Sequence, residues 1–394
     1  FDVLVFESGM FGCREAARAF EADELAPRVS AELGIFPIWT RSRDLLPLWD
    51  MIAETGRTER PLELCGYDFQ ITGRAAERMP DALRDVCKSA KVPARSIDTV
   101  VSVARAAVAG EGHDGWKGRT EKATGAAFED ARERIADAGG VDERERAFWV
   151  RYITSLEAFA RSLADPAPDS APLYEHFNPR DRTGGETLIW LANEHYAGRK
   201  LIVWQASMHA LRDHPKLPPP PGSSYAKVVS AGHVLCEEIG DEAYVVAFCA
   251  AEGRAGLPWG RPWDIGASPP RSFEALCVEA GLENAFVPLR GLDKKSPLSK
   301  SLQARPLGHR PIKAKWPRHC DAFVFTRQMR PSAPLEADAD ADTPVDGPFD
   351  LGPAIEEQLR SIAGGESGGN VWATKWRLTE EWKRWLRATR PTPE

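Results

Sequence analysis

The chain opens with an almost continuous apolar run. Residues 1–6 are nearly all apolar, which is typical of a strand covered on both faces, and glycines at positions 9 and 12 separate this run from a helical stretch. Apolar residues recur at helical spacing over 43–54, and residues 61–67 form a second short strand pattern. This order of elements predicts a βαβ unit at the start of the chain.

The pattern changes to long helical periodicity between residues 80 and 165. It predicts helices over 97–109, 121–138 and 142–163, and strand signals are few. We interpret this segment as a helical insertion that forms a lid or a lobe beside an α/β core.

The alternation of strand and helix resumes after residue 165. A helix is expected to begin directly after Arg180, and a strand should lead towards His209. A Trp-rich helix at the end of the sequence is expected to pack against the domain. The predicted elements are helix 181–196, strand 200–204, helix 232–239, strand 244–250, helix 272–280, strands 285–289 and 321–325, and helix 371–386.

Together these patterns predict an α/β fold with a mostly parallel central sheet, flanking helices and the helical insertion. Residues 1–79 would form the N-terminal part of the α/β core, and residues 80–165 the insertion. Residues 166–394 would form the remainder of the core together with the C-terminal helices.

Composition and charge narrow the class of protein. Hydrophobic residues make up 43% of the 394 residues and charged residues 28%, as in an ordinary folded protein. The net charge of -7 argues against a nucleic-acid partner. The longest apolar stretch, 244–251, is too short to span a bilayer, and the seven cysteines form no Cys-x-x-Cys pair. We therefore predict a soluble, cytoplasmic protein without membrane contact.

Familiar catalytic motifs find little support. Gly365, Ser367 and Gly369 match the Gly-x-Ser-x-Gly nucleophile elbow, but no strand precedes them and no Asp or His follows Ser367. Phosphate loops, dinucleotide fingerprints and the His-Glu-x-x-His zinc helix are absent from the sequence. No cofactor and no metal ion are predicted from local motifs.

Four segments, in this order along the chain, carry a family resemblance. They are Phe6-Glu7 followed by Gly66-Tyr67-Asp68-Phe69-Gln70; Arg180-Asp181 followed by 187–191; Ile202-Val203-Trp204-Gln205-Ala206-Ser207-Met208-His209; and 231–253. The chain therefore resembles the erythromycin esterase family, and the match continues through 272–290 and 321–325.

This resemblance implies an ester hydrolase without a serine nucleophile, in which a general base activates water to cleave an ester or a macrolide lactone. It implies catalytic roles for Glu7, Arg180 and His209 and substrate contacts from Asp68, His233 and Trp204. Glu7 also has a physical reason to be in a site, because open α/β sheets bind ligands at the carboxyl ends of their strands.

Two features of the sequence depart from the family pattern. The third segment has Ala206 and Ser207 where the family has histidine and asparagine. The family's base histidine lies in a Gly-Glu-x-x-His-Gly segment, which we expect upstream of Phe1. His233 is a candidate to compensate for the histidine that is missing at position 206.

Two other functions remain open at this point. The change at Ala206 suggests a divergent, non-catalytic member that binds a bulky apolar ligand in the same cleft. A metal-dependent hydrolase is also possible, because Glu and His side chains from separate strands can meet around a divalent ion without a local motif. In each case the partner is a small molecule.

Overall fold

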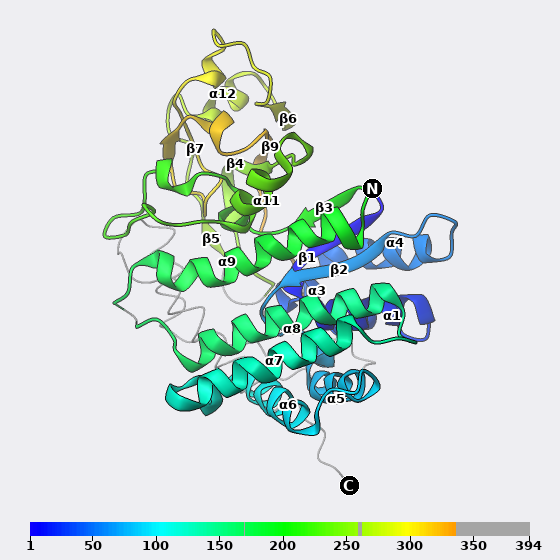
Figure 1. Ribbon diagram of the computed structural model, residues 1–394. Coiled ribbons are helices and arrows are strands. Elements are labelled where there is room, and N and C mark those ends of the chain that lie inside the picture. The colour runs from blue at the N-terminus through cyan, green and yellow to red at the C-terminus, as the bar shows by residue number, and fades with distance from the viewer. Residues whose placement is uncertain (169, 259–261, 336–394) are drawn as a thin grey trace.

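A computed structural model describes residues 1–168, 170–258 and 262–335 of the chain (Figure 1). The Gly365-Ser367-Gly369 match and the Trp-rich helix predicted at 371–386 lie outside these residues. Helices and strands alternate in a mixed α/β architecture, as predicted. In the described part of the chain no helix is both long and apolar enough to cross a membrane.

The N-terminal strand forms the centre of a three-stranded parallel sheet. β1 (Val3–Gly9) lies between β2 (Glu63–Asp68) and β3 (Leu201–Trp204). The predicted βαβ unit is present, with α1 (Met10–Ala22) and α4 (Leu46–Gly56) between β1 and β2. Two short helices, α2 (Pro27–Glu32) and α3 (Pro37–Thr40), complete this connection.

Both faces of this sheet are buried, which explains the continuous apolar run at the start of the chain. Leu4 and Phe6 pack on one face against residues of α1 and α4, including Trp49. Val3 and Val5 point to the other face and belong to a cluster dominated by the helices that follow β2. The sheet is thus a layer between two sets of helices.

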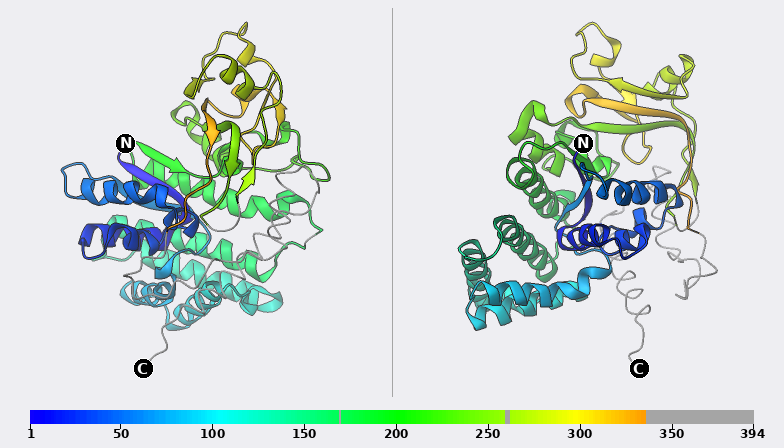
Figure 2. Two further views of the ribbon diagram at one scale, coloured as in Figure 1. Left: turned by 180° about the vertical axis from the view of Figure 1, so that it is seen from behind. Right: turned by 90° about the vertical axis from the view of Figure 1, so that its right-hand side faces the viewer.

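The segment between β2 and β3 is helical, as the periodicity of the sequence predicts, whereas its role as a separate lid or lobe stays a prediction. It contains α5 (Met79–Ser89), α6 (Ala94–Ala109), α7 (Glu121–Ala136) and α8 (Glu143–Ala164). These helices pack side by side below the sheet (Figures 1 and 2). Their buried residues join the same hydrophobic cluster as Val3 and Val5, so the insertion covers one face of the sheet.

The prediction of one mostly parallel central sheet is wrong. The later strands form a second sheet, in the order β5 (Trp263–Asp264), β4 (Val246–Ala255), β9 (Ala322–Met329) and β6 (Asn284–Pro288). In it β4 and β9 are parallel, but β5 and β6 pair antiparallel to their neighbours. β7 (Leu302–Ala304) and β8 (Ile312–Ala314) form a separate antiparallel pair.

The second sheet could not be predicted because the apolar pattern of a strand indicates its burial but not the strand with which it pairs. The second sheet has its own hydrophobic cluster, in which α12 (Phe273–Glu279) contributes Phe273 against Phe323 and Phe325 of β9. The α/β alternation along the sequence is the same whether the strands join one sheet or two.

The helix predicted at 181–196 begins eight residues earlier than expected. α9 spans Leu173–Trp190 and continues as a π-helical turn, Leu191–His195. Pro179 lies inside this helix, where a proline usually marks a boundary. Arg180 therefore lies within α9 and does not open it.

A close helix contact positions the second half of α9. A β-carbon added at Gly185 would lie 2.5 Å from Cβ of Val234 and 3.0 Å from the carbonyl oxygen of Ala231. Both neighbours belong to α11 (Ala231–Ile239). Because glycine has no side chain, α9 and α11 approach each other more closely than any other residue at position 185 would allow.

We predict that Gly185→Ala destabilises the protein although alanine is the better helix former. Gly125→Ala in α7 is the matched control, since the nearest atom to its added β-carbon is the flexible Arg161 guanidinium, at 3.5 Å. The control should be neutral or gain up to about 1 kcal/mol. Gly185→Ala should lose about 1–3 kcal/mol, because overpacking forces backbone shifts. Guanidinium-induced unfolding of both variants tests this; equal effects would contradict the close contact.

Candidate active site

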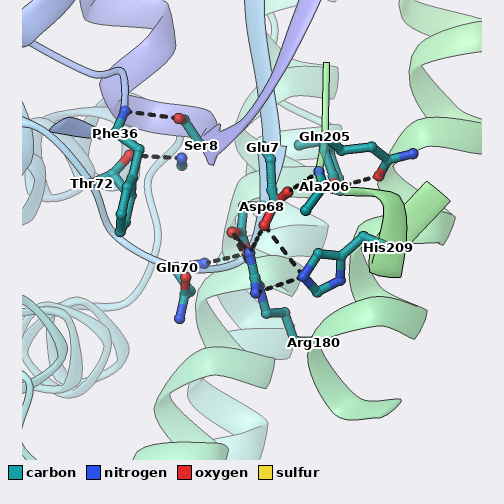
Figure 3. A network of polar contacts seen from close by, with 12 residues as sticks. Glu7, Ser8, Phe36, Asp68, Gln70, Thr72, Arg180, Gln205, Ala206 and His209 are labelled. Atoms are coloured by element: carbon teal, nitrogen blue, oxygen red, sulfur yellow. Dashed lines mark hydrogen bonds and ion pairs between the residues drawn. The ribbon is translucent and has the colours of Figure 1, made fainter. Parts of the chain in front are cut away.

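The carboxyl ends of the three parallel strands bring together polar side chains from distant parts of the sequence. Glu7 lies on β1 just beyond Phe6, where regular pairing with β2 and β3 stops. Asp68 is the last residue of β2, and His209 lies on the short helix α10 (Ser207–Ala210) that follows β3. Figure 3 shows these side chains converging with Arg180 of α9.

Arg180 is the centre of this cluster. Its Nη2 donates to Oε1 of Glu7 at 2.7 Å and to Oδ2 of Asp68 at 2.5 Å, and its Nε lies 2.9 Å from Oδ1 of Asp68. Only 9% of the residue is exposed. Burial lowers the pKa of this guanidinium, but the charges of Asp68, Glu7 and Asp181 more than reverse this and raise it well above its usual value. Arg180 is therefore a permanent, buried cation.

His209 is held between two carboxylates. Its Nδ1 lies 2.8 Å from Oδ1 and 2.9 Å from Oδ2 of Asp181, and its Nε2 lies 3.3 Å from Oε1 of Glu7. Nε2 is also 3.3 Å from Nη1 of Arg180. The ring stacks on Phe177, with ring centroids 5.1 Å apart and planes inclined by 4°. The imidazole is thus fixed in position and orientation, and Nε2 faces the Glu7–Arg180 pair.

Asp181 belongs to the cluster, although the sequence did not predict it as a site residue. It is 1% exposed, and Oδ1 also accepts a hydrogen bond of 3.0 Å from the backbone N–H of Ala231 at the start of α11. The close packing of α9 on α11 makes this bond possible. The signal was present, because Asp181 stands beside Arg180 in the second family segment, but sequence alone did not show which side of α9 it occupies.

A second set of contacts holds the cluster from outside. The backbone N–H of Ala206 donates to Oε2 of Glu7 at 2.8 Å, and that of Gln70 donates to Oδ1 of Asp68 at 3.2 Å. The hydroxyl of Tyr67 donates to Oε1 of Gln205 at 2.6 Å. Burial, followed by the charges of Glu7 and Asp68, raises the pKa of Tyr67 well above its usual value, so this phenol stays neutral.

The structure brings together four of the six site residues that the sequence predicts: Glu7, Asp68, Arg180 and His209. Trp204 packs instead between Phe6 and Trp39, at centroid distances of 5.9 and 5.6 Å. His233 pairs on its own helix with Glu237, at 3.3 Å. The catalytic and substrate-binding roles of all six residues stay predictions.

The cluster contains three carboxylates, from Glu7, Asp68 and Asp181, around one guanidinium and one imidazole. Arg180 occupies the position between Glu7 and Asp68 that a bound cation would need. In the described part of the chain, no group of three or more His, Cys, Asp and Glu side chains is arranged to hold a metal ion.

A large cavity lies beside the cluster. Its volume is about 1190 Å³, and its walls come from the loops after α2 and β2, from α8 and from the first half of α9. Among the described residues its lining includes Arg180 and Asp181 but neither Glu7 nor His209. Its larger aromatic and aliphatic lining residues are Phe36, Ile38, Phe69, Ile71, Trp116, Phe159, Tyr174, Phe177 and Leu257.

A family comparison now decides the classification. The family model described as erythromycin esterase matches residues 1–329. The chain belongs to the erythromycin esterase family. No curated protein matches the chain in sequence. The matched region contains all the cluster residues: Glu7, Asp68, Arg180, Asp181 and His209.

Three solved structures share the erythromycin esterase family fold of this chain at low sequence identity. A Bacillus cereus protein has a TM-score of 0.67 and 17% identity, covering 85% of this chain and 83% of its own. A succinoglycan biosynthesis protein has a TM-score of 0.61 and 13% identity, covering 85% and 81%. A variant of the erythromycin esterase EreC in its open conformation has a TM-score of 0.58 and 13% identity, covering 86% and 85%.

We predict that Arg180→Met lowers stability by about 3–5 kcal/mol, because it leaves Glu7 and Asp68 buried without their counter-charge. Adding Glu7→Gln and Asp68→Asn to that variant should restore part of the loss. Arg182→Met is the control, since Arg182 lies two residues further along α9 and is exposed. Guanidinium-induced unfolding measures all three. A loss at Arg182 as large as that at Arg180, or no recovery in the triple variant, would show that charge is not the cause.

The buried His214 packs between the rings of Phe177 and Tyr225, and Phe177 in turn stacks on His209 of the cluster. The ring centroid of His214 lies 6.2 Å from that of Phe177 and 5.7 Å from that of Tyr225. Within the described residues neither ring nitrogen has a hydrogen-bond partner. Burial, followed by the positive charge of nearby histidines, lowers the pKa of His214 to about 3. The folded protein therefore keeps this imidazole neutral.

This low pKa predicts a specific loss of stability in acid. A histidine in the unfolded chain has a pKa of about 6.5. Between pH 6.5 and 3, His214 therefore binds a proton in the unfolded chain but stays neutral in the folded protein. Stability contributed by the neutral ring is present above pH 6.5 and falls as the pH falls. His214→Leu should therefore unfold at a higher temperature than the parent by a margin that grows from pH 7.5 to pH 4.5. The partly exposed His233, changed to Leu, serves as control; a margin independent of pH at position 214 contradicts the prediction.

Proposed function

We propose that this member of the erythromycin esterase family hydrolyses an ester or a lactone of a bulky, largely apolar small molecule. The observation that carries the proposal is the fixed His209, with Asp181 on Nδ1 and with Nε2 facing Glu7 and Arg180. This is the arrangement of a general base with an orienting carboxylate, built without a serine nucleophile.

In the proposed reaction, Asp181 accepts the Nδ1–H bond of His209 and so leaves Nε2 as the base. Nε2 takes a proton from water, and the resulting hydroxide attacks the carbonyl carbon of the ester. Glu7, 3.3 Å from Nε2, stabilises the imidazolium that forms. The imidazolium then returns the proton to the departing alkoxide, so that an acid and an alcohol are released.

Arg180 is proposed to stabilise the oxyanion of the tetrahedral intermediate. It is the one cluster residue that both contacts His209 and lines the cavity with a positive charge. Its Nη2 and Nε are occupied by Glu7 and Asp68, and its Nη1 lies 3.3 Å from Nε2 of His209. The substrate would therefore meet the guanidinium on its Nη1 side, next to the base. A guanidinium fixed in this way needs no reorganisation as the negative charge develops.

The cavity supports a bulky substrate. Ligand pockets usually enclose about 300–1,000 Å³, and this cavity is larger, at about 1190 Å³. Trp116, Phe159 and Arg161 line it from the helical insertion, which supports the role of 80–165 as one wall of the substrate site. A macrolide lactone has the size and apolar character that such walls would accept.

A second candidate function is binding without turnover. It is supported by the lining of the cavity, which among the described residues includes Phe177 but not His209 or Glu7. Phe177 stacks on His209 and itself lines the cavity. A bulky ligand could therefore occupy the cavity without reaching the base, as could be expected of a member with Ala206 in place of the family histidine.

We expect the protein to hydrolyse members of a panel of macrolides and aryl esters, and His209→Ala to lower kcat/KM by about 10²–10⁴-fold, as loss of a general base does. Glu7→Gln should also lower kcat/KM, because the imidazolium then loses the carboxylate that stabilises it. His113→Ala, in the helical insertion, is the matched histidine control and should keep its activity. Circular dichroism and the thermal midpoint confirm that each variant is folded.

The same assay separates the alternatives. If the parent turns nothing over but binds a macrolide in isothermal titration calorimetry, the binding function replaces the hydrolase. Loss of activity after exhaustive chelation, restored by a divalent metal, would favour the metal-dependent hydrolase. Equal loss in His209→Ala and in the His113→Ala control would falsify the assignment of the base.

A further inference from the structure

A second hollow lies in the C-terminal part of the described chain, and its lining shares no residue with the cluster. Its volume is about 570 Å³. It is formed by the loop after β6, by the short helical turns Pro297–Ser299 and Trp316–Arg318, and by Asp321 just before β9. In Figure 1 these elements lie at the opposite end of the molecule from α5 and α6.

The lining of this hollow has a net positive charge, whereas the chain as a whole has a net negative charge. Its lining contains four basic side chains, Arg290, Lys294, Lys300 and Lys315, but one acidic side chain, Asp321. The chain overall has a net charge of -7. A local excess of positive charge in a concave site attracts anions, because low-dielectric walls concentrate the field.

Arg290 and Asp321, which both line the hollow, are held in place by hydrogen bonds. Nε of Arg290 donates to Oδ1 of Asp321 at 3.0 Å, and its other nitrogens donate to the carbonyl oxygens of Asp241 and Ala243. Arg212 donates two further bonds of 2.9 Å to Asp321. Burial raises the pKa of Asp321, but its hydrogen bonds from Arg290 and Arg212 lower it below its usual value. Asp321 thus stays ionised, and two guanidinium groups exceed its charge.

Within the described part of the chain, no ion pair joins Lys294, Lys300 or Lys315 to a carboxylate, so these three lysines offer positive charge to a ligand. Lys294 and Lys300 flank the helical turn Pro297–Ser299, Lys315 directly precedes the turn Trp316–Arg318, and all three line the same hollow. The segment between the first two is held in shape by Ser299, whose hydroxyl donates to the carbonyl oxygens of Lys294 and Ser296.

We propose that this hollow is a binding site for a small, multiply charged oxyanion, such as a phosphate or sulfate ester. The lysines would neutralise the oxyanion, while Leu289, Leu292 and Pro317 offer apolar contacts to an organic group attached to it. The volume suits a ligand much smaller than the one that the large cavity would take. This site does not depend on the proposed hydrolase function, because it shares no residue with the cluster or the large cavity.

Isothermal titration calorimetry of the protein with inorganic pyrophosphate tests this site directly. The full chain should bind it saturably, with one site per chain. The triple variant Lys294→Gln, Lys300→Gln, Lys315→Gln should lose at least about tenfold in affinity, because three attractive charges are removed. Its thermal midpoint in the absence of ligand should stay at the parent value, since these lysines are exposed.

A second triple variant controls for net charge. Lys88→Gln, Lys122→Gln and Lys313→Gln remove the same charge from exposed positions outside the hollow. This control should bind pyrophosphate like the parent. The proposal fails if the parent shows no saturable binding, or if both triple variants weaken binding equally. Parallel titrations with inorganic sulfate and with phosphate show which oxyanion the site prefers.

Discussion

The structure depends on one buried guanidinium. Three strand ends and a helix meet at a point where two carboxylates, Glu7 and Asp68, would otherwise be buried beside each other without compensation. Arg180 reaches both with bonds of 2.5–3.1 Å. Removing one partner from such a network leaves an isolated buried charge, so the three groups stabilise one another only as a set. The position of α9 above the sheet follows from this requirement.

The same arginine connects the fold with the proposed chemistry. It lines the cavity on one side and contacts His209 on the other, while Asp181, its neighbour in sequence, orients that histidine. In the proposed reaction, two consecutive residues of α9 would therefore serve the electrostatic and the acid–base parts of the site. Their positions depend in turn on Gly185, where the absence of a side chain lets α11 come close enough to hold Asp181.

Local patterns in the sequence were sufficient for the elements but not for their assembly. The apolar run at Val3–Phe6 predicts a buried strand, and Glu7 beyond it a site residue, because both follow from periodicity and from the end of a strand. The family resemblance adds Arg180 and His209. The second sheet could not be predicted, because strand patterns do not encode partners, and Pro179 concealed the start of α9. The role of Asp181 depends on a side-chain direction and on a helix contact that no spacing in one sequence reveals.

The pairing of β1 with β3 also bears on how the molecule is made. Val3–Phe6 is synthesised well before its partner, Leu201–Trp204, which follows about 200 residues later. Pairings over such separations form slowly, because a long loop must be closed before the contacts stabilise it. The helices of the insertion consist of local contacts and can form in the meantime. During synthesis, one edge of β1 therefore stays unpaired until β3 has left the ribosome, and His209, which follows β3, joins the cluster in that same late step.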